Sequence, residues 1–131
     1  MKPVALPSTT IPHPAMSYSQ AVTVGNLVFV AGQAGVDFET GFISPDFETQ
    51  ARQAFANLSA VLTAADSGLD RVVKTTVWLV DAANFDCLNR LYAEYFPTNP
   101  PARSTPVVDL PRKEFQLSIE AIATVARTQS Y

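Results

Sequence analysis

The sequence predicts an α+β fold in which a mixed sheet of about six strands carries two helices on one face. Three observations support this prediction. A Gly25-Asn26 turn joins two short apolar strands, and this pair suits a hairpin because both residues tolerate positive φ. Two longer segments place apolar residues at helical spacing. They alternate with strands in the order strand, helix, strand, helix, strand, which builds two right-handed crossovers over one sheet.

Length and composition indicate one globular domain. The chain has 131 residues, of which 47% are hydrophobic and 16% are charged. This is enough for a single core and too apolar for a disordered chain. We therefore expect one domain over residues 1–131, beginning with an irregular, proline-rich arm over residues 1–17. His13 lies in that arm and is either an exposed loop residue or an acid–base group at the edge of a site.

The charged residues argue against nucleic-acid and membrane partners. The net charge is −3, and the nine lysines and arginines are scattered along the chain. A nucleic acid or an anionic membrane surface would select a basic stripe. No apolar run approaches the roughly 20 residues of a membrane span, and the first residues lack the pattern of a secretory signal. We expect a cytoplasmic protein.

The content of cysteine and histidine limits the metal and redox chemistry that is open to the chain. Cys87 is the single cysteine and His13 the single histidine of the sequence. One cysteine forms no intrachain disulfide, and together the two residues do not make a zinc or thiol–metal cluster. We expect no metal and no cofactor.

The first strands are expected over residues 20–24 and 27–31, with Tyr18 opening the first of them. Gly32 follows the second strand, and the missing side chain there lets a ligand or another strand approach closely. Residues 36–43 then predict a loop or a short hairpin.

The first helix is expected to begin around Ser44-Pro45-Asp46, where a cap candidate, a proline in the first turn and an acid stand together. About five turns follow before Ser67-Gly68 ends the helix. Arg52 and Gln53 fall off its apolar stripe and are expected in solvent. The stripe consists of Ala51, Ala54, Phe55, Leu58, Val61, Leu62 and Ala65.

Residues 71–80 are rich in Val, Thr and Trp and predict an internal strand. Its Lys74 is a surface lysine or a Schiff-base group, and no pyridoxal-binding context supports the second interpretation. Trp78 is expected in the core rather than as a stacking platform.

The second helix is expected to be capped by Asp81 or Asn84. Its apolar stripe consists of Phe85, Leu88, Leu91, Tyr92, Tyr95 and Phe96. Asn89 and Cys87 fall off this stripe, so Asn89 can face something other than the core. No basic neighbour of Cys87 is evident, and we do not expect it to act as a nucleophile.

The last two strands carry the candidate chemistry. Pro100 and Pro101 stiffen the chain before Arg103, whose guanidinium is a fork of donors shaped for a carboxylate. Glu120 is the single acid in the apolar strand over residues 115–125, and a charge there needs a partner or a use. Two interpretations are open. The two residues neutralise one another across adjacent strands, or Arg103 orients a small acid while Glu120 activates a water as general base.

The last strand also predicts self-association. Both of its alternating sets of side chains are substantially apolar over residues 117–125. A strand that is half-apolar on its second face suggests burial against another subunit.

Several motifs together resemble the RidA (YjgF-like) family of reactive enamine/imine deaminases. The signature is Pro-Ala-Arg-Ser around Arg103, followed by Ile-Glu-Ala-Ile-Ala around Glu120. Further matches are Gly32-Gln33, Gln50-Ala51-Arg52-Gln53, Val73-Lys74-Thr75-Thr76-Val77 and Asn89-x-x-Tyr92-x-x-Tyr95-Phe96. The resemblance extends over residues 18–125.

The resemblance implies a chorismate-mutase-like fold and a homotrimer whose three sheets form a central barrel, with active sites in clefts between neighbours. It implies hydrolysis of 2-amino-acid-derived enamines and imines of the 2-aminoacrylate type to 2-keto acids and ammonia, without a cofactor. Arg103 and Glu120 would be catalytic. The substrate-binding residues would be Tyr18, Ala31, Gly32, Asn89, Arg103 and Thr105.

The chain departs from the family pattern at two positions. Ala31 stands where the family commonly has a serine, and Thr105 stands where it often has a cysteine. The lost hydroxyl keeps a second function class open, a non-catalytic small-carboxylate-binding or stress-protective protein on the same scaffold. A third class, a ribonuclease or translation inhibitor, fits an acidic chain with one histidine least well.

Overall fold

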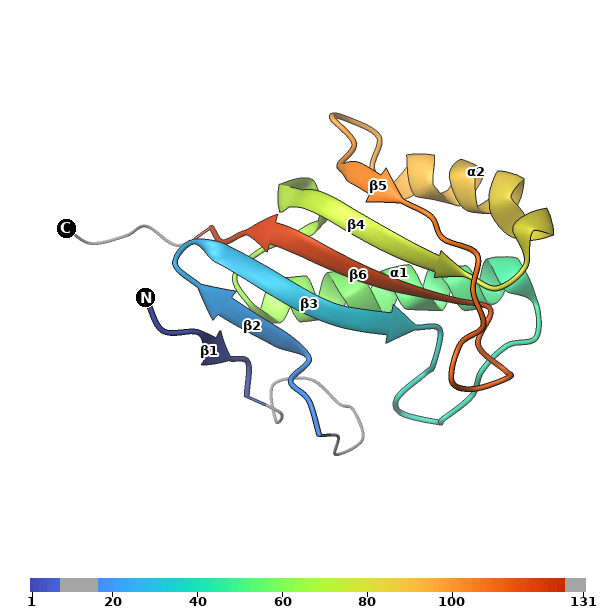
Figure 1. Cartoon of the computed structure of the whole chain (residues 1–131), viewed down its shortest axis with the longest axis horizontal. Helices are drawn as coiled ribbons and strands as arrows, with labels where there is room; N and C mark the ends of the chain where they lie inside the picture. The colour runs from blue at the N-terminus through green and yellow to red at the C-terminus, as the bar shows by residue number, and fades with distance from the viewer. Residues whose placement is uncertain (8–16, 127–131) are drawn as a thin grey trace.

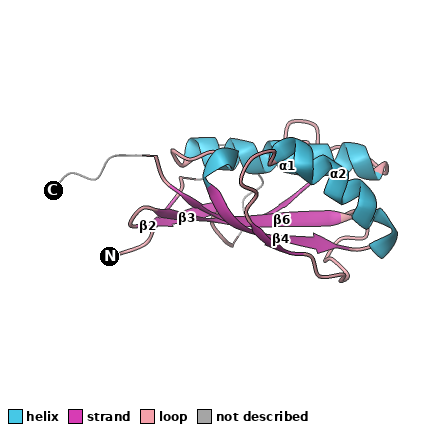
Figure 2. Cartoon of the chain, turned by 90° about the horizontal axis from the view of Figure 1, so that it is seen from above, coloured by secondary structure: helices cyan, strands magenta, loops and turns pink. Residues whose placement is uncertain are grey.

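A computed structural model describes residues 1–7 and 17–126 of the chain. Within this part the chain forms one six-stranded sheet with the strand order β1-β2-β3-β6-β4-β5. Helices α1 (Phe47–Ala64) and α2 (Phe85–Tyr95) lie together on one face of that sheet, as Figures 1 and 2 show. The predicted α+β fold is confirmed. The strands are β1 (Val4–Ala5), β2 (Ala21–Val24), β3 (Leu27–Ala34), β4 (Val72–Leu79), β5 (Ala102–Ser104) and β6 (Leu117–Thr124).

The N-terminal hairpin is formed by β2 and β3, which pair antiparallel across the predicted turn. Gly25 has φ +60° there, the left-handed conformation that glycine adopts without penalty. β3 is longer than expected, because Gln33 and Ala34 also pair with β6. The arm over residues 1–17 is not wholly irregular, since β1 pairs with β2 through Val4 and Thr23. His13 lies outside the described residues.

The chain order and the strand order differ at one place. β6 comes last in the sequence but lies between β3 and β4 and is antiparallel to both. β4 is therefore internal, as predicted, and its other neighbour is the short parallel strand β5 at the edge of the sheet. Figure 1 shows β6 running through the middle of the sheet.

The core lies between the helices and one face of the sheet. In β6 the alternation is regular, with the side chains at positions 117, 119, 121 and 123 buried and those between them half-buried. The fully buried large side chains on α1 and α2 are Gln50, Phe55, Leu58, Val61, Leu62, Leu88 and Leu91. Two core predictions were wrong. Phe85 is 41% exposed, and Trp78 is half-buried on the face of the sheet away from the helices.

Asp46 begins α1. Its carboxylate accepts a hydrogen bond from the Thr49 backbone N–H at 3.0 Å and from the Thr49 hydroxyl at 2.7 Å. Such a cap satisfies donors that the first helical turn leaves free. Pro45 therefore precedes the helix instead of lying in its first turn. In α2 the expected side-chain cap is made one turn earlier, where Asp81 accepts from Ala83 N–H at the start of a short 3₁₀ turn.

Gln50 of α1 is a fully buried polar residue that joins three segments. Its amide nitrogen donates to the carbonyls of Ser44 at 2.8 Å and Glu114 at 3.0 Å. Its amide oxygen accepts from the Gln116 backbone N–H at 2.6 Å. Because a buried amide is stable only when it is hydrogen-bonded, these bonds tie the turn before α1 to the segment before β6.

The helices of the described residues are too short or too polar to cross a lipid bilayer.

Candidate functional site

Arg103 lies on the edge strand β5 and points toward α2. Its register partner on β4 is Thr75, a fully buried residue whose hydroxyl lies 2.7 Å from the Tyr92 hydroxyl. The Arg103 guanidinium carbon lies 4.6 Å from the centre of the Tyr92 ring and 5.6 Å from that of Phe85. One guanidinium nitrogen, Nη2, donates to Asn89 Oδ1 at 2.7 Å. The structure thus brings together two predicted site residues, Arg103 and Asn89.

Arg103 is half-buried and has no carboxylate partner among the described residues. Arg52, Arg90 and Arg112 each form an ion pair with a glutamate. A guanidinium carries five N–H donors in a planar fork, so donors of Arg103 are left for a ligand. This arrangement suits a planar carboxylate.

Tyr92 provides an uncharged surface beneath the guanidinium. Burial raises the pKa of its phenol, against the opposing effects of the Thr75 hydrogen bond and the Arg103 charge. The phenol is therefore neutral at physiological pH. A neutral aromatic face attracts a guanidinium through the ring quadrupole without competing for its N–H donors in the plane.

Glu120 lies on the opposite face of the sheet. Its partner on β4 is Thr76, the neighbour of the residue that pairs with Arg103. Since successive side chains of a strand point to opposite faces, Glu120 and Arg103 point away from each other. β4 also lies between the strands that carry them. The interpretation in which the two residues neutralise one another across adjacent strands is wrong.

A β-bulge faces Glu120. The pairs Val30–Ala121 and Gln33–Ile119 flank an irregularity in which Ala31 and Gly32 oppose the single residue Glu120. Bulges of this kind occur often beside active sites, where they re-aim side chains. A Cβ on Gly32 would lie 2.6 Å from the Ser118 hydroxyl, so the close approach made by Gly32 is to the neighbouring strand. Ala31, Gly32 and Glu120 thus form a second group of predicted site residues.

Two cavities adjoin this second group. One, of about 190 Å³, is bounded by Glu120, Lys74 and Phe29 on the helix-free face. The other, of about 410 Å³, is mostly apolar and is lined by Tyr18, Gly32, Leu110, Phe115 and Ser118 among others. Tyr18 is therefore near Gly32, while Thr105 directly follows β5 and belongs to the Arg103 side.

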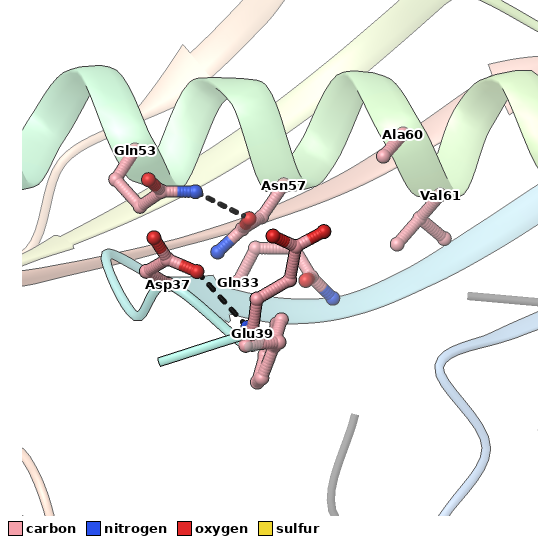
Figure 3. Close-up of a pocket in the computed structure, with 8 residues that line it drawn as sticks. Gln33, Asp37, Glu39, Gln53, Asn57, Ala60 and Val61 are labelled. Atoms are coloured by element: carbon pink, nitrogen blue, oxygen red, sulfur yellow. Dashed lines mark hydrogen bonds between the residues drawn. The ribbon is translucent and has the colours of Figure 1, made fainter. Parts of the chain in front are cut away.

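A third cavity, of about 260 Å³, lies between α1 and the loop over residues 36–40 (Figure 3). Polar side chains that line this cavity form hydrogen bonds with the backbone in and beside the loop. Asp37 accepts from the Glu39 backbone N–H at 2.9 Å, and the Asn57 amide donates to the Ala34 and Val36 carbonyls, both at 2.9 Å. In the described part of the chain, no three side chains of the His, Cys, Asp or Glu type lie close enough to hold a metal ion.

The sequence analysis missed the aromatic side chains around Arg103. Phe85 and Tyr92 were assigned to the buried stripe of α2. A signal was available, because Phe85, Asn89 and Tyr92 stand at positions i, i+4 and i+7 and so share one face of the helix. A basic neighbour of Cys87 was also missed, since the Arg90 guanidinium lies 3.5 Å from its sulfur.

The chain is similar in sequence and in structure to known proteins. The family model described as Endoribonuclease L-PSP matches residues 8–125. Reactive Intermediate Deaminase A, chloroplastic, of Arabidopsis thaliana is 43% identical over 109 residues, which cover 82% of this chain and 58% of that protein. The human 2-iminobutanoate/2-iminopropanoate deaminase is 39% identical over 107 residues, which cover 81% of this chain and 78% of the relative. The crystal structure of E. coli TdcF with bound serine matches with a TM-score of 0.85 at 33% identity, over 94% of this chain and 99% of that one.

Proposed function

The chain belongs to the RidA (YjgF-like) family, and from that membership we propose that it is a hydrolytic deaminase of reactive 2-amino-acid-derived enamines and imines. The products are a 2-keto acid and ammonia. The names of the Arabidopsis and human relatives support a deaminase. The substrate class that we assign is a small carboxylate-bearing imine of the 2-aminoacrylate type.

One observation carries the proposal. Arg103 is a half-buried cation that is braced by two aromatic rings and an amide but has no carboxylate partner among the described residues. A buried charge without a counter-ion is costly, so such an arginine suits an anionic ligand. Every 2-amino-acid imine carries a carboxylate next to its C=N bond, and Arg103 would bind it through two parallel hydrogen bonds.

The chemistry needs a water, a base and an electrophile. The protonated imine supplies the electrophilic carbon itself. Glu120 removes a proton from a water as its oxygen bonds to that carbon, which gives a tetrahedral carbinolamine. Glu120 returns its proton to the nitrogen, and the C–N bond breaks so that ammonia leaves. The hydroxyl gives up its proton to the Glu120 carboxylate as the carbonyl of the 2-keto acid forms, and ammonia carries that proton away as ammonium. Tyr18, Asn89 and Thr105 provide neutral hydrogen-bonding groups around the substrate.

Two copies of the chain are needed to assemble such a site. Within one chain Arg103 and Glu120 point to opposite faces of the sheet. A neighbouring subunit in a closed ring can bring its own Glu120 face against the Arg103 edge. We assign Arg103, Asn89 and Thr105 to one subunit and Glu120, Tyr18, Ala31 and Gly32 to its neighbour, in a homotrimer with intersubunit sites.

The test supplies the imine as it forms. An amino-acid oxidase generates 2-imino acids of graded side-chain size, and the release of ammonia and 2-keto acid is followed in competition with semicarbazide, which traps the imine. We expect the protein to release ammonia faster than spontaneous hydrolysis and to lower the yield of trapped imine. An Arg103→Ala variant serves as the control and should behave like buffer.

Two results would replace the deaminase with another function class. Binding of a small 2-keto acid without any acceleration of ammonia release would leave a non-catalytic small-carboxylate-binding protein. RNA cleavage by the protein after purification from contaminating nucleases, and loss of that cleavage in an Arg103→Ala variant, would instead establish a ribonuclease.

A further inference from the structure

We propose that Phe85 and Tyr92 are positioning residues for Arg103, holding its guanidinium in the orientation in which it binds a carboxylate. The inference rests on the proposed function, because it takes Arg103 as the carboxylate-binding group. Neither aromatic residue touches the substrate in this role. Both act through the arginine.

Both aromatic rings lie within contact distance of the guanidinium. Cation–π attraction operates within about 6 Å of a ring centre, and the Arg103 guanidinium carbon lies 4.6 Å from the Tyr92 centre and 5.6 Å from the Phe85 centre. Asn89, between them on α2, accepts from Nη2 at 2.7 Å. A single helical face thus restrains the guanidinium through three contacts, and no other described residue accepts a hydrogen bond from it.

Tyr92 is itself held in place by its neighbours. It is 7% exposed, and its hydroxyl lies 2.7 Å from the Thr75 hydroxyl. Its ring also packs against Phe55 and Phe96, with centre distances of 6.1 and 4.6 Å. Thr75 is the register partner of Arg103 on the neighbouring strand. Thr75 therefore contacts both the strand that carries Arg103 and the ring that lies against its guanidinium. This shared neighbour fixes the position of the guanidinium relative to β4.

The exposure of Phe85 also indicates a role outside the core. Its side chain is 41% exposed although it stands on the apolar stripe of α2. The core does not account for this position, whereas the contact with Arg103 does. Phe85 lies against the guanidinium, and this contact restricts a long arginine side chain on a three-residue edge strand, which would otherwise sample several rotamers.

The expected consequence is an effect on binding and not on the chemical step. A guanidinium that is already oriented loses less conformational freedom when it binds a carboxylate. The carboxylate contact is the same in the substrate and in the transition state, so weakening it raises KM and leaves kcat unchanged. A residue that merely supported the fold would lower the yield or the melting temperature without this split.

The experiment compares Phe85→Leu, Phe85→Tyr and Phe42→Leu with the parent. Phe42 is a matched control because it is 61% exposed and lies in the loop over residues 36–43. The Kd of 2-oxobutanoate is measured by calorimetry, and kcat and KM are measured with oxidase-generated imines. We expect Phe85→Leu to raise Kd and KM about two- to fivefold, as for one partly exposed cation–π contact. Phe85→Tyr and Phe42→Leu should match the parent.

Tyr92 is tested by a graded pair, because a large change at a buried position can unfold the chain. Tyr92→Phe keeps the ring and removes the Thr75 hydrogen bond, so its Kd should rise less than that of Tyr92→Leu, which removes the ring. If Tyr92→Leu does not fold, the exposed Phe85 series decides the proposal alone.

A readout without ligand separates this inference from the function it rests on. The rings should shift the Arg103 side-chain proton resonances upfield, and Phe85→Leu should reduce that shift while Phe42→Leu does not. A parent that neither binds 2-oxobutanoate nor deaminates imines overturns the proposed function. A parent that does both, with a Phe85→Leu variant whose Kd and KM equal those of Phe42→Leu, overturns the positioning role.

Discussion

Arg103 and Glu120 occupy opposite faces of one sheet, with β4 between the strands that carry them. Their partners on β4 are the consecutive residues Thr75 and Thr76. Thr75 faces the helices and is buried, while Thr76 is half-buried on the other face. Under the proposed function, a single chain therefore offers two incomplete sites, one around Arg103 and one around Glu120, and neighbouring subunits join them.

Mixing two inactive variants should restore activity. Arg103→Ala lacks the carboxylate-binding group and Glu120→Gln lacks the base. If the two residues reach one substrate from neighbouring subunits, co-expressed variants form some sites in which both residues are intact, about a quarter by random assortment in a ring. Ammonia release by the mixed oligomers measures this. A mixture as inactive as its components would show that both groups act from the same chain, or that one of them does not act.

The protein should be a homotrimer at micromolar concentration. Phe29 is 42% exposed on the helix-free face, beside the half-buried Ile122, and an apolar surface of this kind is buried in an oligomer. Phe29→Glu should shift the sedimentation equilibrium toward monomer, whereas Phe42→Glu, at an exposed phenylalanine of the loop over residues 36–43, should not. A parent that sediments as a monomer contradicts the assembly and the intersubunit site together.

Arg103→Lys should lose most activity although the charge is kept. Lysine offers a point charge where a planar fork is needed, and it gives up the stacking on Tyr92. Losing one charge-assisted hydrogen bond costs on the order of 1.5–3 kcal/mol, or roughly a tenfold to a hundredfold loss in rate or affinity. The matched control is Arg71→Lys at an exposed arginine. A fully active Arg103→Lys variant would mean that another group binds the carboxylate.

Ala31→Ser should raise activity on the smallest imine relative to larger ones. Ala31 stands in the bulge opposite Glu120, and its backbone is fixed by bonds to Gln20 and Gln33, so the exchange acts through the side chain. The new hydroxyl takes up room and adds a donor and an acceptor. One neutral hydrogen bond is worth about 1 kcal/mol, or roughly fivefold. Imines of graded size measure the profile, with Ala83→Ser as the surface control, and an unchanged profile means that Ala31 faces away from the substrate.

The Asp46 cap should make stability depend on pH in a defined direction. Hydrogen bonds from the Thr49 backbone and then from its hydroxyl lower the pKa of the Asp46 carboxyl below its ordinary value of 3.8. Its contribution to the free energy of unfolding is therefore complete above that value and is lost as the pH falls through the lowered pKa.

Asp46→Ala should accordingly melt at a lower temperature than the parent at pH 7, and the difference should shrink in acid. Asp46→Asn keeps the acceptor without the titration and isolates the pH-dependent part. The exposed Asp109→Ala should leave the melting temperature unchanged. A difference between the parent and Asp46→Ala that stays constant down to pH 2 would contradict the cap as the source.

Local patterns were sufficient for the elements and insufficient for the site. The Gly25-Asn26 turn and the stripe of α1 are each encoded within a few residues, and the structure has both; β5 also begins directly after the two prolines. The relative facing of Arg103 and Glu120 is not local. It depends on the register of two strands against β4, which long-range pairing decides.

The wrong prediction for Phe85 has the same origin, because it also depends on contacts that are distant in the sequence. Apolar spacing on α2 could not separate Phe85 from Leu88, because both belong to one periodic stripe. The face that Phe85 shares with Asn89 was a sequence signal, and the position of β5 beside the helix shows that Phe85 lies against a guanidinium instead of the core. The longer β3 was missed because the bulge at Ala31 and Gly32 restores pairing beyond the point where the apolar run ends.

The central place of β6 constrains how the protein is made. The strands that flank it, β3 and β4, have no direct pairing with each other in the sheet, and residues 117–124 follow both of them in the chain. Until they leave the ribosome, both flanking strands present open edges and an incomplete core. The nascent chain can form its hairpin and helices early, but the sheet closes only after residues 117–124 have been synthesised. Premature termination ahead of residue 117 therefore yields an aggregation-prone fragment and not a smaller folded domain.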